Sequence, residues 1–132
     1  MAVFESTEKM YEVLGGLFTG LMNNEEVLAK VLKANITIMF DITEPKGQIW
    51  LDPNGGGVIC GKADLKPDVT MSLSGDTCHH FWLKNISLPV AIAKRKVKTK
   101  GPLPKVLKLL PLLKPAHDAY PEIAKANGLP LK

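Results

Sequence analysis

The chain has 132 residues, of which 45% are hydrophobic and 23% are charged, and its net charge is +4. This length is typical of one domain with a real core, and so mixed a composition excludes an intrinsically disordered chain. No apolar run approaches the ~20 residues of a membrane-spanning helix, and the N-terminus lacks the basic and apolar regions of a signal peptide. We therefore expect a single cytoplasmic domain over residues 1–132, with Cys60 and Cys78 as reduced thiols.

Two amphipathic helices are predicted first. Apolar residues recur at three- and four-residue spacing between Val3 and Met22, and Asn23 and Asn24 can end that helix and cap the next one, Glu25 to Lys33. The buried face of the second helix is expected to consist of Val27, Leu28, Val31 and Leu32.

After residue 34 the period changes to two, which predicts strands. Five are expected, near residues 35–42, 47–52, 56–61, 68–74 and 96–100. Between the last two, Asp76 is expected to cap a helix over 77–84, and a second short helix follows over 88–93. From Leu103 the pattern is helical, with breaks or kinks expected at Pro111, Pro115 and Pro121. The order of elements predicts one α+β domain.

Four motifs carry a resemblance to a known family. They are P-D-V-T-M-S-L-S-G-D from Pro67, F-W-L-K from Phe81, L-P-V-A-I-A from Leu88 and K-V-K-T-K-G from Lys96. The chain resembles the sterol carrier protein 2 family over about residues 10–113, and residues 114–132 are then a C-terminal helical extension. Lys94 and Arg95 stand where that family usually has a glycine.

The resemblance implies a twisted five-stranded mixed sheet, covered on one face by helices, with an apolar cavity between the layers. It also implies that the protein binds a lipid without catalysis and without a cofactor. The ligand would be a sterol, fatty acid, acyl-coenzyme A or phospholipid. The residues expected to line the cavity are Phe40, Met71, Leu73, Phe81, Ile86, Leu88, Val90, Ile92, Leu103, Val106, Leu107 and Leu110.

The charge is divided unevenly along the chain. Residues 1–83 carry six lysines and eleven acidic residues, whereas residues 84–132 carry eleven basic residues and two acidic ones. Such a basic half can meet anionic membranes, and Lys98, Lys100, Lys105 and Lys108 are the expected contacts. A solvated basic edge is about as probable, so both interpretations stay open.

Two other functions are weaker alternatives. The same fold can serve as an accessory module whose leucine-rich C-terminal helix packs on a partner protein. A nucleic-acid binder built on residues 94–108 is less favoured, because no aromatic side chains are interleaved with the basic run. The oligomeric state is left open.

Metal binding and catalysis are not expected. Cys78, His79 and His80 are adjacent, but neighbouring histidines on a helix point about 100° apart and do not converge on one ion. An exposed helix face is the favoured interpretation of this pair. The glycines 55–57 precede a strand rather than a helix, so they do not form a phosphate-binding loop.

Overall fold

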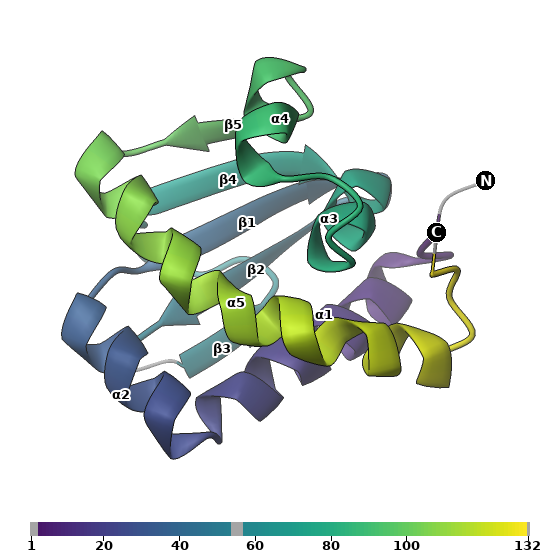
Figure 1. Cartoon of the computed structure of the whole chain (residues 1–132), viewed down its shortest axis with the longest axis horizontal. Coiled ribbons are helices and arrows are strands. Elements are labelled where there is room, and N and C mark those ends of the chain that lie inside the picture. Colours follow the sequence, from purple (N-terminus) through teal and green to yellow (C-terminus); the bar gives the residue numbers. More distant parts are fainter. Residues whose placement is uncertain (1–2, 54–56, 132) are drawn as a thin grey trace.

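The computed structural model describes residues 3–53 and 57–131, and for residues 103, 106, 107 and 109–113 it describes the backbone alone. The elements follow the order expected for an α+β domain (Figure 1). They are α1 (Thr7–Met22), α2 (Glu25–Ala34), β1 (Ile38–Thr43), β2 (Gly47–Asp52), β3 (Gly57–Cys60), β4 (Val69–Ser74), α3 (Gly75–Trp82), α4 (Leu88–Ala93), β5 (Val97–Lys100) and α5 (Leu103–Ala126).

The described strands form a five-stranded sheet in the order β3-β2-β1-β4-β5. The pair β1–β4 is parallel and the others are antiparallel, so the sheet is mixed as predicted. Alternate residues of β1 and β4 are buried, among them Phe40 and Met71, which are 1% exposed. The helices pack on this buried face, with α5 crossing in front of the sheet (Figure 1).

The boundary between α1 and α2 is confirmed by its caps. Asn23 is the C-cap of α1, and the side chain of Asn24 accepts hydrogen bonds from the backbone of Glu26 and Val27. The predicted buried face of α2 is wrong at Leu32, which is 51% exposed. Because α2 lies at the edge of the helical layer, only the side of the helix that carries Val27 is covered.

The N-cap of α3 differs from the prediction. Ser74 caps this helix by accepting from the backbone N–H of Thr77, and its side chain also contacts the Thr77 hydroxyl. Asp76 lies inside the first turn, where one of its carboxylate oxygens accepts from the backbone N–H of Val3 at 2.8 Å. The helix therefore begins two residues earlier than the position of the aspartate indicated.

The turn into β5 is made without the glycine that the resemblance favoured. Arg95 occupies the left-handed region with φ +60°, a conformation that glycine adopts at little cost. At the other end of β5, Gly101 has φ +131°, and an added Cβ would lie 2.5 Å from the carbonyl oxygen of Asp68. That close approach explains the glycine in the K-V-K-T-K-G motif.

The C-terminal segment was predicted to break or kink at its prolines, and a break is wrong, because α5 is one continuous helix of 24 residues. Pro111, Pro115 and Pro121 all lie inside it, although an interior proline removes a backbone hydrogen bond at a cost of about 3 kcal/mol. Burial of Ala116, Tyr120 and Ala124, each at most 1% exposed, offsets that cost. The part of α5 beyond residue 114 thus contributes to the core.

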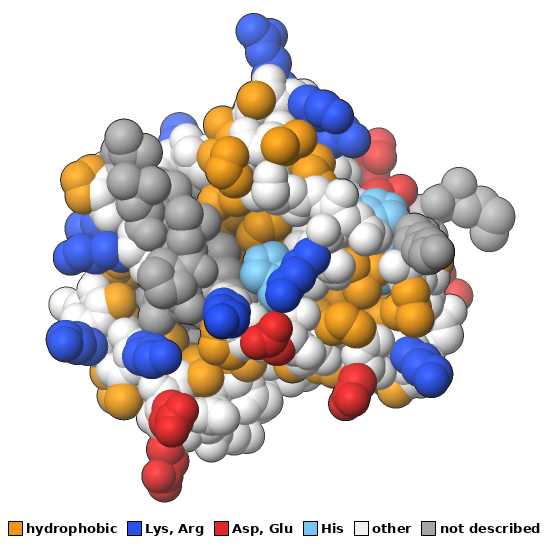
Figure 2. All heavy atoms as spheres, viewed as in Figure 1, with side chains coloured by type: hydrophobic (Ala, Val, Ile, Leu, Met, Phe, Trp, Pro, Cys, Tyr) orange, Lys and Arg blue, Asp and Glu red, His pale blue; other side chains and the backbone are white. Residues whose placement is uncertain are grey.

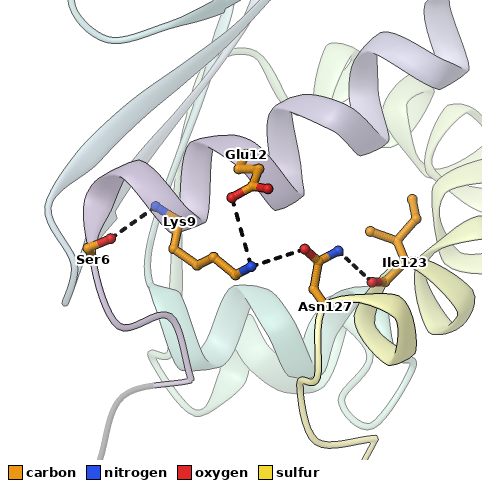
Figure 3. Close-up of polar contacts among 5 residues, drawn as sticks. All are labelled: Ser6, Lys9, Glu12, Ile123 and Asn127. Atoms are coloured by element: carbon orange, nitrogen blue, oxygen red, sulfur yellow. Dashed lines mark hydrogen bonds and ion pairs between the residues drawn. The ribbon is translucent and has the colours of Figure 1, made fainter.

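Polar contacts hold the end of α5 against the start of α1 (Figure 3). The Nζ atom of Lys9 donates to Oδ1 of Asn127 at 3.1 Å, and Nδ2 of Asn127 donates to the carbonyl oxygen of Ile123 at 2.8 Å. Glu12 lies 3.8 Å from the same ammonium group. The two terminal segments of the chain are therefore joined at one end of the molecule.

Candidate functional site

The strand residues predicted to line a cavity lie in the closed core. Phe40 stacks on Phe18 with ring centroids 5.3 Å apart, and the edge of Trp82 packs against both rings. Met71 and Leu73 are 1% and 5% exposed on the neighbouring strand. None of these three predicted residues borders the two apolar pockets described below, and Leu73 borders a separate groove that Arg95 and Lys98 also line.

An inner cavity lies between the two N-terminal helices, the sheet and α5. Its volume is about 40 Å³, and its lining is wholly apolar: Phe18, Leu21, Met22, Val27, Val31, Ile36, Ile38, Leu51 and Ala116. Sites for small molecules measure ~300–1,000 Å³. The inner cavity as it stands is therefore far too small for a lipid.

A larger apolar pocket lies where α3, α4 and α5 meet. Its volume is about 350 Å³, which is within the range of small-molecule sites. Its lining residues are Phe81, Lys84, Ile86, Ser87, Leu88, Pro89 and His117. Hydrophobic side chains gather in the hollow beneath α4, with a histidine beside them (Figure 2). The prediction had named Phe81, Ile86 and Leu88, and the structure brings these three together.

His117 forms the α5 wall of the apolar pocket. Its ring packs edge-on against Phe81 at 4.9 Å, and its Nδ1–H donates to the carbonyl oxygen of Trp82 at 3.4 Å. Burial lowers the pKa of His117 below its usual value of 6.5, so the ring is neutral at pH 7. The next residue, Asp118, pairs with Lys84 at 3.5 Å. The pocket therefore has an apolar interior and an ion pair beside it.

A second, polar pocket of about 690 Å³ adjoins the apolar one. It is lined by Asp76, Thr77, His80, Asn85, Ile86, Ser87, Val90, Lys94 and Lys96. Val90, which the prediction assigned to the lipid cavity, borders this polar pocket and is 43% exposed. Ile92, also predicted, is 40% exposed and borders neither pocket.

The other predicted residues have different outcomes. Leu103, Val106, Leu107 and Leu110 lie outside the residues whose side chains the structure describes. Of the basic residues, Lys98, Lys100 and Lys108 are exposed. Lys105 instead donates to Asp68 at 3.0 Å. The backbone N–H of Thr37 and the ammonium group of Lys105 both lower the pKa of Asp68. The ion pair between Lys105 and Asp68 joins the start of α5 to the sheet.

His79 is fully buried, which corrects the interpretation of the His79–His80 pair as an exposed helix face. The carbonyl oxygen of Pro130 can only accept, so Nε2–H of His79 donates to it, at 2.7 Å. On a neutral ring Nδ1 then accepts from the Tyr120 hydroxyl, also at 2.7 Å. Helical spacing alone gives no hint that α5 and the C-terminal tail cover this face.

Burial raises the pKa of Cys78 to about 12, so its thiol stays protonated. In the part of the chain that the structure describes, no three His, Cys, Asp or Glu side chains are placed to hold a metal. No helix within those residues is long and apolar enough to cross a membrane.

Sequence reasoning missed four lining residues of the apolar pocket: Lys84, Ser87, Pro89 and His117. His117 belongs to the segment interpreted as an extension, and its pocket depends on α5 continuing through Pro111 and Pro115. The sequence did contain one signal for this pocket: only the five residues 83–87 separate the two short helices α3 and α4, so the ends of these helices must lie close together.

Comparisons with known proteins agree with this architecture. The sequence model of the SCP-2 sterol transfer family matches residues 17–114. Among solved structures, sterol carrier protein 2 from Yarrowia lipolytica in its apo form is 21% identical, with 85% of this chain and 92% of that one covered and a TM-score of 0.65. The sterol carrier protein domain 2 of Helicoverpa armigera is 20% identical, with 82% and 87% covered and a TM-score of 0.66.

A third similar structure is sterol carrier protein 2 from Aedes aegypti in complex with the C16 fatty acid palmitate. It is 17% identical, with 69% of this chain and 94% of that one covered and a TM-score of 0.52. Among curated protein sequences, none matches significantly. At these identities the structures show a shared fold, and the family match extends from the middle of α1 into α5. The chain belongs to the SCP-2 sterol transfer family.

Proposed function

We propose that this protein is a non-catalytic lipid carrier that holds the apolar part of its ligand in the apolar pocket between α3, α4 and α5. The observation that carries this proposal is a pocket of about 350 Å³ whose deep wall is formed by Phe81 and Leu88. Each methylene that moves from water into such a site contributes about 0.8 kcal/mol. Useful affinity then requires few polar contacts.

The surroundings of the pocket support a carrier rather than an enzyme. The titratable groups in its lining are Lys84, which is paired with Asp118, and His117, which hydrogen-bonds a backbone carbonyl. Among the described residues, neither group hydrogen-bonds a hydroxyl or thiol that it would activate as a nucleophile. The palmitate complex of the Aedes aegypti protein, which shares the fold, makes a fatty acid a sensible first ligand to test.

Replacing Ile86 with arginine tests the proposal. Ile86 borders the apolar pocket and is half-buried, so a longer charged side chain should occupy the space of the ligand without entering the core. A fluorescent fatty-acid analogue should bind the parent protein with micromolar affinity and bind Ile86→Arg at least about tenfold more weakly.

Leu32→Arg is the matched control, because Leu32 is 51% exposed and borders none of the pockets described above. It should bind the analogue like the parent. Equal affinities of all three proteins for the analogue would contradict the proposed site.

We also propose that the basic edge formed by Lys98, Lys100 and Lys108 approaches anionic membranes during lipid delivery. All three side chains are exposed and form no ion pair with the residues that the structure describes. Changing them to glutamine should slow delivery to acidic vesicles at low salt and leave delivery to neutral vesicles unchanged. Equal delivery by mutant and parent would refute this role.

A further inference from the structure

The apolar pocket and the polar pocket are neighbours. They meet at Ile86 and Ser87, the two residues that line both. One side of this junction carries Phe81 and Leu88, and the other carries Lys94 and Lys96. A ligand that fills both must be apolar at one end and polar at the other.

The polar pocket has a surplus of positive charge. Lys94 and Lys96 form no ion pair with any part of the chain that the structure describes. The one carboxylate in the lining, Asp76, already accepts from the backbone of Val3. The lining of the polar pocket therefore holds two lysines and one carboxylate, and that carboxylate already accepts a hydrogen bond. An anion in this pocket gains favourable interactions that a neutral group does not.

The uncharged groups of the polar pocket add hydrogen-bond donors. The side-chain amide of Asn85 donates from Nδ2 to Nδ1 of His80 at 3.2 Å, so on a neutral ring the proton of His80 is on Nε2. Within the described residues this Nε2–H has no protein acceptor. The Ser87 hydroxyl does not cap α4. Both groups can donate to the oxygens of a carboxylate or phosphate.

We propose that the polar pocket is a head-group subsite and that the protein prefers amphiphiles with an anionic carboxylate or phosphate head over neutral lipids. This inference rests on the proposed lipid-binding function and adds the chemistry of the ligand. The chain of the ligand lies in the apolar pocket, it passes Ile86 and Ser87, and its head lies against Lys94 and Lys96. Arg95 and Lys98 lie beyond it, in a shallower groove that shares Lys96.

Three amphiphiles of sixteen carbons each, which differ in the head group, separate the contribution of the head from that of the tail. Palmitate, hexadecyl phosphate and 1-hexadecanol are titrated against the delipidated full chain at pH 8 and low salt, by displacement of a neutral fluorescent lipid. The parent should bind the two anions about tenfold more tightly than the alcohol, and this preference should shrink as salt rises. Inorganic phosphate alone should displace neither probe nor ligand at equal concentration, because it lacks the tail.

The double variant Lys94→Gln/Lys96→Gln should lose most of the preference, by about fivefold or more, while its affinity for 1-hexadecanol stays within about twofold of the parent. Lys30→Gln/Lys33→Gln removes the same charge from exposed positions on α2, outside the pockets named above, and should keep the preference. Equal binding of alcohol and anions by the parent, or equal losses in both double variants, would overturn the subsite. In that event bound alcohol would still support the carrier function, whereas no binding of any of the three ligands would refute the carrier function itself.

Discussion

Replacing Phe18 with alanine should destabilise the folded protein by about 3–5 kcal/mol. Phe18 is 2% exposed and joins α1 to the sheet by stacking on Phe40, with the rings 10° from parallel. Trp82 packs its edge against the same ring at 5.5 Å, so α3 loses a contact as well. The inner cavity already adjoins Phe18, and the truncation would enlarge it. The free energy of unfolding in urea measures the loss.

Leu32→Ala is the control for that measurement. Its side chain is half exposed on α2, and such surface changes usually alter stability by no more than about 0.5 kcal/mol. A loss below about 1 kcal/mol for Phe18→Ala would show that the aromatic cluster is not the centre of the core.

Replacing His79 with phenylalanine should cost about 2–4 kcal/mol and should weaken the dependence of stability on pH. The phenyl ring fills similar space, but the buried Tyr120 hydroxyl loses its partner, and an unsatisfied buried group costs about 1–3 kcal/mol. The hydrogen bond to the carbonyl of the exposed Pro130 is lost as well. His80→Phe is the matched control, since His80 is only partly buried and has one exposed side-chain hydrogen bond.

The sign of the pH effect follows from burial. Desolvation lowers the pKa of His79 in the folded protein below 6.5, so the unfolded chain binds more protons as the pH falls through 6.5. The parent protein should therefore have its full stability above pH 6.5 and lose stability below it. Pro130 and Asp76 oppose the shift, whereas His80 adds to it.

Unfolding in urea at pH 7.5 and pH 5.5 measures this dependence. His79→Phe should lose less stability than the parent between the two pH values. Part of the pH dependence of stability should remain in this variant, because burial also lowers the pKa of His117. The same slope in both proteins would show that His79 does not carry the acid sensitivity.

Alternation made the sheet predictable. In β1 and β4 every second side chain faces the core, and the buried positions are hydrophobic, so the alternation is visible in the sequence. Where a helix begins or ends, and which of its faces another element buries, depended instead on contacts between residues far apart in the sequence. Asp76 holds Val3 rather than capping α3, and α5 stays helical through its prolines because Tyr120 and Ala124 are buried against the core.

The candidate site was predictable in part. Phe81, Ile86 and Leu88 surround a turn between two short helices, and they border the apolar pocket. Their contact with a lipid stays a prediction. Phe40 and Met71 were named as inward-facing residues of their strands, but a period of two shows only that a side chain points inward. Whether it meets a neighbour or a space depends on how α1 and α5 pack above it, and no local pattern records that.

Nuclear Overhauser effects between bound palmitate and the methyl groups of the protein test the central claim most directly. The claim that the acyl chain occupies the pocket of α3, α4 and α5 predicts contacts to Ile86 and Leu88, with none to the exposed methyl groups of Leu32 and Leu65. Contacts confined to Val27, Val31 and Ile38 would place the chain in the inner cavity and contradict the account. The absence of any contact at saturating palmitate would contradict it equally.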